Sequence, residues 1–143
     1  MMRSAPFTLL VLSSALLVGG CRRPAPSGGP FVQTACMGEV GDNPGQLSYP
    51  RCLDHDTDGL WVIDKLARVQ RLDPATGLAT LGWRMPAWEN GKPTGLTVWK
   101  PPAGGPTRII IPDTHYHRVM IYDPEALAPG ADPLHEGGEL IGQ

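Results

Sequence analysis

The chain has 143 residues, enough for one small domain and too few for a two-domain enzyme. Its 18 glycines and 16 prolines interrupt the chain so often that short strands and turns are favoured over long helices. The net charge of -2, without long runs of Lys or Arg, excludes the basic surface typical of nucleic-acid binders, so no nucleic-acid partner is expected.

Residues 1–20 have the pattern of a signal peptide. Arg3 supplies a positive charge, and residues 7–18 form an apolar stretch too short to span a bilayer comfortably. The sequence VGGC that follows resembles a bacterial lipobox, in which the Cys21 thiol carries a diacylglyceryl group. Several hydrocarbon chains give stable anchoring. We therefore expect a lipoprotein of the cell envelope, anchored in the membrane through Cys21 and facing the periplasm or the exterior.

A tether and two cysteines follow this lipidation site. Residues 21–30 (CRRPAPSGGP) are expected to be a flexible tether, and residues 31–37 (FVQTACM) are predicted as an outer strand of a preceding sheet. Cys36 and Cys52 are candidates for a disulfide in an exported protein. Sequence alone does not bring their Cα atoms within bridging distance, and unpaired buried cysteines are common, so free thiols are the alternative.

Eight further strands are predicted, in two groups of four. Apolar and alternating runs place the first group at 51–56, 59–64, 68–72 and 78–83. The second group is predicted at 95–99, 108–111, 118–122 and 139–141. Turn sequences such as DTDG at 56–59 separate the strands. The pattern predicts an all-β fold.

The two groups are copies of one unit. Residues 49–77 align with residues 92–124, and the equivalent pairs are Pro50 and Pro93, Leu53 and Leu96, Trp61-Val62 and Ile110-Ile111, Asp64 and Asp113, Arg68-Val69 and Arg118-Val119, and Asp73-Pro74 and Asp123-Pro124. The second copy has a longer loop at 100–107 and one more residue between Asp113 and Arg118. Four-stranded units that recur about every 40 to 50 residues are typical of a β-propeller.

The first copy resembles an NHL repeat, whose pattern begins with spaced glycines, continues through G-Q-[FL]-x-x-P and ends in N-H-R-[IV]-x-x-[FY]-D. The matching residues are Gly38, Gly41, Gly45, Gln46, Leu47, Pro50, Leu53, Gly59, Trp61, Val62, Asp64, Arg68, Val69 and Asp73. The second copy matches through Pro93, Gly95, Leu96, Asp113, His117, Arg118, Val119, Tyr122 and Asp123. The first copy departs from the pattern at Arg51, Cys52 and Ala67.

This resemblance implies an NHL-type β-propeller domain over residues 31–143. It has about two four-stranded antiparallel blades, at about 38–83 and 93–143, and an incomplete ring, since such propellers commonly have six blades. Two interpretations follow. The chain is a truncated product or fragment, which is the favoured interpretation, or it completes a ring by self-association through its open blade edges.

Blade geometry predicts which loops share a face. The turns at 64–67 and 113–117 are expected to open on the same side as segments 46–50 and 84–94. This face carries Tyr49 and the candidate ligand-binding residues Trp88, His115, Tyr116 and His117. A protein or small-molecule ligand is expected to bind there.

Two acidic patterns suggest metal sites, and each has a structural alternative. Asp113, His115 and His117 alternate and are candidate ligands for zinc or another divalent ion. The favoured alternative is that Asp113, His117 and Arg118 belong to the repeat, where such residues cap the turn and bond to the backbone. The DHDTDG sequence at 54–59 resembles the start of a calcium loop, but Lys65 occupies the final ligand position, so a hairpin turn is favoured. No cofactor is firmly implied.

The functional expectation is a binding module, not an enzyme. The sequence contains none of the GxSxG, HExxH, GxGxxG or P-loop motifs of common catalytic and nucleotide sites. The alternative implied by the resemblance is a fragment of a propeller enzyme, such as a metal-dependent lyase or a lactonase-like hydrolase. Such enzymes draw metal ligands from several blades, and two blades cannot supply that ring of ligands.

Overall fold

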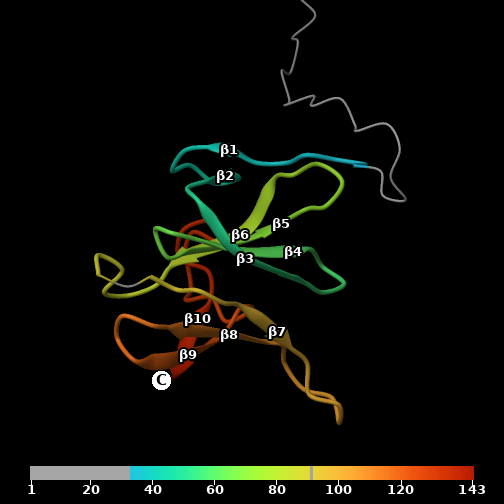
Figure 1. Cartoon of the computed structure of the whole chain (residues 1–143). Coiled ribbons are helices and arrows are strands. Elements are labelled where there is room, and N and C mark those ends of the chain that lie inside the picture. The colour runs from blue at the N-terminus through green and yellow to red at the C-terminus, as the bar shows by residue number, and fades with distance from the viewer. Residues whose placement is uncertain (1–32, 91) are drawn as a thin grey trace, which may run out of the picture. The chain divides into compact units, whose positions relative to one another are not determined.

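The computed structural model describes residues 33–90 and 92–143 (Figure 1). The chain divides into two units, Met1–Cys36 and Met37–Gln143, and all strands of the described residues belong to the second. The expected signal peptide, Cys21 and the tether at 21–30 lie outside the described residues. No helix among the described residues has the length and hydropathy needed to cross a membrane.

Eight strands form two four-stranded antiparallel sheets, and within each sheet every strand pairs with its neighbours along the chain. The first sheet contains β3 (Pro50–His55), β4 (Leu60–Asp64), β5 (Arg68–Leu72) and β6 (Ala79–Arg84). The second contains β7 (Thr97–Trp99), β8 (Arg108–Asp113), β9 (Arg118–Asp123) and β10 (Glu139–Gly142). The predicted all-β class and the eight strands are confirmed, and the described residues do not close a ring.

The segment before the first sheet differs from the prediction. β1 (Glu39–Val40) and β2 (Gln46–Leu47) form a small parallel pair that was not expected. The strand predicted at 31–37 is wrong over its described part, because residues 33–38 form no strand. A strand needs a neighbour for its backbone N–H and C=O groups, and none of the described strands pairs with this segment.

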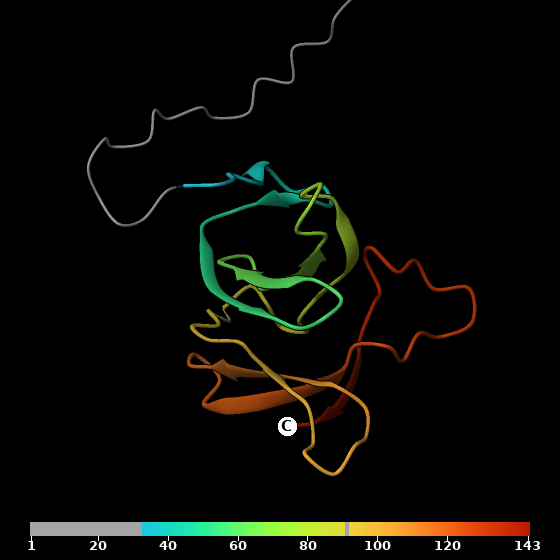
Figure 2. The same cartoon turned by 90° about the vertical axis from the view of Figure 1, so that its right-hand side faces the viewer.

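Apolar residues at every second position of the strands let the two sheets pack face to face (Figures 1 and 2). In β4, Trp61 and Ile63 are completely buried and belong to the same core as Ile109 and Ile111 of β8. Neighbouring residues on each strand point to the opposite side of their sheet. The joint core consists of Trp61, Ile63, Ala67, Val69, Leu81, Trp83, Met85, Leu96, Ile109, Ile111, Met120 and Tyr122.

Aromatic rings cross the junction between the sheets. The Trp83 ring lies edge-on to Trp61, with centroids 5.9 Å apart, and its centroid is 5.1 Å from that of Tyr122 in the second sheet. Burial raises the pKa of the Tyr122 hydroxyl to about 12, although the Arg118 charge and the Trp83 side chain act in the opposite direction. Tyr122 therefore stays neutral at physiological pH, as its apolar surroundings require.

Backbone and side-chain hydrogen bonds close this junction at both edges. At the outer edge, Gly82 of β6 donates its N–H to Pro133 and accepts one from Gly137, both in the β9–β10 connection. At the other edge, the Asp54 carboxylate of β3 accepts the Val98 N–H of β7 at 2.7 Å. The relative placement of the two sheets thus rests on hydrogen bonds as well as apolar packing.

Candidate functional site

The turn between β4 and β5 is organised by one carboxylate. Asp64 is completely buried, and its Oδ1 accepts the N–H groups of Leu66 and Arg68 at 2.9 and 3.1 Å. Ala67 takes a φ of 56°, in the left-handed region, and donates its N–H to the Asp64 carbonyl. Short acidic side chains cap turns in this way because they satisfy N–H groups that the turn leaves unpaired.

Arg68 joins this turn to the segment that precedes the sheet. Its Nε and Nη2 donate to Asp64 Oδ2 at 2.9 and 2.6 Å, and Nη2 also donates to the carbonyls of Gly41 and Gln46. Ser48 donates its N–H to the same carboxylate oxygen at 3.1 Å. A buried ion pair is stable only when its remaining hydrogen-bonding groups are satisfied, and here the backbone satisfies them.

The turn between β8 and β9 repeats the ion pair but not its surroundings. Arg118 Nε and Nη2 donate to Asp113 Oδ2 at 3.2 and 3.1 Å, and His117 has a φ of 51°, close to that of Ala67. Asp113 is only 1% exposed, yet its Oδ1 has no hydrogen-bond partner within the described part of the chain. The extra residue in this turn changes its backbone path, and no turn N–H donates to that oxygen.

The candidate metal ligands are not brought together as a set. Asp113 is buried in its ion pair, whereas His115 and His117 are exposed. His115 Nδ1 lies 3.4 Å from the Thr114 hydroxyl. Across residues 33–90 and 92–143, no group of three or more His, Cys, Asp or Glu side chains is placed to hold a metal ion. Metal binding by Asp113, His115 and His117 therefore stays a prediction.

Trp88 lies in the connection between the two sheets, which contacts both turns. Met85 donates its N–H to the Ala67 carbonyl, and Arg118 donates to the Pro86 carbonyl at 3.0 Å. Trp88 is half-buried against the joint core. These contacts place the 84–94 connection beside both turns, along the left edge of Figure 1, as the antiparallel strand order predicts.

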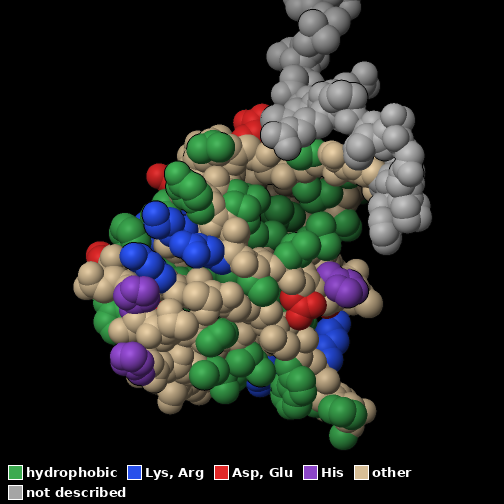
Figure 3. All heavy atoms as spheres, in the orientation of Figure 1, with side chains coloured by type: hydrophobic (Ala, Val, Ile, Leu, Met, Phe, Trp, Pro, Cys, Tyr) green, Lys and Arg blue, Asp and Glu red, His purple; other side chains and the backbone are tan. Residues whose placement is uncertain are grey.

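Segment 46–50 lies on the same side. Lys65 of the first turn donates its N–H to the carbonyls of Ser48 and Tyr49. Tyr49 is 72% exposed, so its ring is available to solvent. We define the loop face as residues 46–50, 64–68, 84–94 and 113–118. Lys, Arg and His side chains gather along the same left edge in Figure 3.

Three cation–aromatic pairs lie on the loop face. Lys65 Nζ is 5.1 Å from the Tyr49 ring centroid. The guanidinium of Arg84 is 4.4 Å from the Trp88 ring, and that of Arg118 is 4.6 Å from the Tyr116 ring. Such pairs form when a cation lies within about 6 Å of a ring. The sequence indicated the aromatic residues but not their cations. Tyr49 and Lys65 come from different segments, whereas Arg84 and Trp88 both lie in the 84–94 connection.

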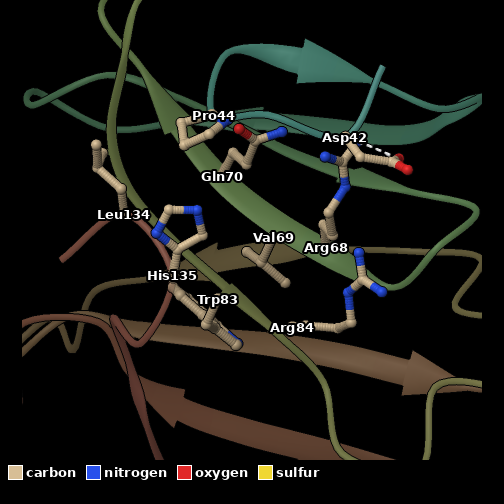
Figure 4. A pocket seen from close by; sticks show the side chains of 9 residues that line it. All are labelled: Asp42, Pro44, Arg68, Val69, Gln70, Trp83, Arg84, Leu134 and His135. Atoms are coloured by element: carbon tan, nitrogen blue, oxygen red, sulfur yellow. Dashed lines mark ion pairs between the residues drawn. The ribbon is translucent and has the colours of Figure 1, made fainter. Parts of the chain in front are cut away.

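A polar hollow of about 80 Å³ lies next to the loop face (Figure 4). Asp42 Oδ1 lies 3.9 Å from Arg68 Nη2 at its rim. Gln70 accepts the Gly45 N–H at 2.8 Å and donates to the Gln46 carbonyl. The hollow is lined by Asp42, Pro44, Arg68, Val69, Gln70, Trp83, Arg84, Leu134 and His135. Sequence analysis missed it because His135 and Leu134 come from a connection with no expected role.

The acidic DTDG segment at 56–59 forms a turn that its own side chains stabilise. Asp56 Oδ1 accepts the N–H groups of Asp58 and Gly59, and its Oδ2 accepts the Trp61 indole N–H at 3.0 Å. These contacts are those of a hairpin turn.

Cys36 and Cys52 are both free thiols in the structure, and Cys52 Sγ lies 3.6 Å from the Leu96 carbonyl oxygen. Their pairing stays a prediction.

Comparisons with known proteins identify no relative. No family model matches the chain, and no curated protein or solved structure matches it.

Replacing Asp by Asn is expected to destabilise the first turn more than the second. Every partner of the Asp64 carboxylate is a donor, so Asp64→Asn sets an amide NH₂ against donors and leaves Arg68 uncompensated. We expect a loss of about 3 to 5 kcal/mol in the free energy of unfolding. Asp113→Asn can place its NH₂ at the unpartnered oxygen position, so a loss of about 1 kcal/mol is expected. Urea unfolding of both variants measures the difference, and equal losses would contradict this account.

Proposed function

We propose that the chain is an exported, lipid-anchored protein of the NHL-repeat propeller type that binds a protein or small ligand through the loop face. The two four-stranded sheets with sequential strand order support the propeller assignment. The Asp-Arg ion pair in the central turn of each sheet supports two copies of one repeat. The NHL assignment itself is carried by the spaced sequence pattern at 38–77 and 93–123.

The three cation–aromatic pairs are the observation that carries the binding function. Tyr, Trp and Arg dominate the energetics of protein interfaces because they combine apolar area with a polar or charged group. On the loop face, Arg84 and Arg118 lie against the rings of Trp88 and Tyr116 and keep those side chains ordered before a partner arrives. Preordered side chains lose less conformational entropy on binding.

The charges of this face indicate the chemistry of its partner. Lys65, Arg84 and Arg118 are paired with aromatic rings, and of these three only Arg118 also has a carboxylate partner within salt-bridge distance among the described residues. An acidic peptide segment with an apolar or aromatic side chain complements this surface, because its carboxylates reach the cations while its side chain packs on the rings.

Peptide selection on the full chain tests the binding function of the loop face. A random peptide library displayed on phage is expected to yield binders rich in Asp and Glu. Trp88→Ala and Tyr116→Ala should each weaken the selected peptides about tenfold or more. Trp99→Ala is the matched control, because Trp99 is 45% exposed and lies outside the loop face. Peptides that bind the Trp88→Ala, Tyr116→Ala double variant with unchanged affinity would rule out the loop face.

Lipid anchoring has its own test. In a bacterial host, the full chain is expected to incorporate labelled palmitate and to sediment with membranes, whereas Cys21→Ser should do neither. Cys36→Ser is the matched control and should behave like the unmodified chain. Membrane sedimentation and labelling of the Cys21→Ser variant at unchanged levels would show that another feature anchors the protein.

A further inference from the structure

Each sheet has one face in the joint core and one face directed away from it. We call these the packed face and the free face of that sheet. Because strand residues alternate, the free face of the first sheet carries Leu53, Leu60, Val62 and Leu72. The free face of the second sheet carries Trp99, Ile110, Pro112, Val119 and Ile121. Each free face therefore has an apolar patch, which adjoins Gln70 in the first sheet and Arg108 in the second.

The internal repeat relates the free face of the first sheet to the packed face of the second. Leu53 is equivalent to Leu96, and Val62 is equivalent to Ile111. Leu96 and Ile111 are 5% and 0% exposed because the first sheet covers them, whereas Leu53 is 61% exposed. Val62 and Leu72 on the same face are only 6% and 1% exposed, so Leu53 is the position of this face that is open to solvent.

The repeat also relates the free face of the second sheet to the packed face of the first. Val119 on the free face of the second sheet is equivalent to Val69 on the packed face of the first. Val69 is 0% exposed and Val119 is 49% exposed. Ile110 likewise takes the place of Trp61, which is fully buried against the second sheet. Among the described residues, one junction between the two types of face is complete, and each remaining face has an exposed apolar residue, Leu53 on the first sheet and Val119 on the second.

The free face of the first sheet contains a hollow, which is lined by the residues whose repeat equivalents are buried in the junction. Its volume is about 360 Å³, and Leu53, Leu60, Val62 and Leu72 line it together with Met37, Leu47, Pro50, Arg51 and Cys52. In the complete junction, the equivalents of these strand residues belong to the same buried core as Trp61 and Val69. On the free face of the second sheet, the residues equivalent to Trp61 and Val69 are Ile110 and Val119. Figure 3 shows hydrophobic side chains around a hollowed region between β1 and β4.

We propose that the free face of the second sheet in one copy of this chain packs on the free face of the first sheet in a second copy. The contact repeats the junction already present within the chain and is head-to-tail, so the two copies contribute different faces. Such a contact leaves one free face at each end and propagates into a ring or a filament. This inference does not depend on the ligand of the loop face, which lies along another side of the sheets.

Two single-face variants test the proposal. The full chain in detergent micelles should form assemblies of two or more copies, measured by light scattering and sedimentation after correction for bound detergent. Val119→Arg and Leu53→Arg should each lower the association constant about tenfold or more, because each places a charge in an apolar contact. Leu127→Arg is the matched control, since Leu127 is 41% exposed and lies outside both free faces. It should leave association unchanged.

A mixture of the two variants distinguishes this contact from other modes of association. Val119→Arg keeps the first free face intact, and Leu53→Arg keeps the second, so an equimolar mixture should form a dead-ended dimer with one copy of each. A symmetric contact between identical faces does not produce this complementation. The proposal is overturned if the unmodified chain is monomeric at high micromolar concentration, if the mixture shows no dimer, or if Leu127→Arg disrupts association as strongly. Circular dichroism verifies that each variant keeps its strand content.

Discussion

The packing of one sheet on the other is the interaction on which the rest of the structure depends. Trp61, Trp83 and Tyr122 form its aromatic centre, and hydrogen bonds at Gly82 and Asp54 close its edges. Neither sheet could bury its apolar residues alone, since a four-stranded sheet exposes two faces and each needs a cover. Within the described residues, the other face of each sheet keeps an exposed apolar residue, Leu53 or Val119, which is the basis for inferring assembly between copies.

The junction also positions the loop face. Because the strands run antiparallel and in sequential order, the β4–β5 turn, the β8–β9 turn and the connection between the sheets emerge on one side. The buried pair of Asp64 and Arg68 fixes the first turn, and Asp113 with Arg118 fixes the second. Arg118 has two roles, since it pairs with the buried carboxylate and also lies against the Tyr116 ring. The architecture and the proposed binding surface therefore share the same residue.

Much of the fold could be predicted because its signals are local. Alternating apolar residues and turn sequences placed all eight strands of the two sheets within two residues of their observed ends, and the repeat identified Asp113 and Arg118 as parts of a turn. The parallel pair β1–β2, the cations beside Tyr49 and Trp88, and the hollow at His135 were not predictable. The hollow and the Lys65–Tyr49 pair depend on contacts between segments that are distant in the sequence. The β1–β2 pair and the Arg84–Trp88 pair join residues close in sequence and depend on the local backbone path.

Native-state hydrogen exchange tests the shared core most directly. If the two sheets form one cooperative unit, amides in the central strands β4 and β8 should exchange with the same opening free energy. Those free energies should also decrease with the same slope as denaturant is added. Exchange of the β8 amides at a clearly lower opening free energy, while β4 stays protected, would show that the second sheet opens alone and would contradict a core that belongs to both sheets.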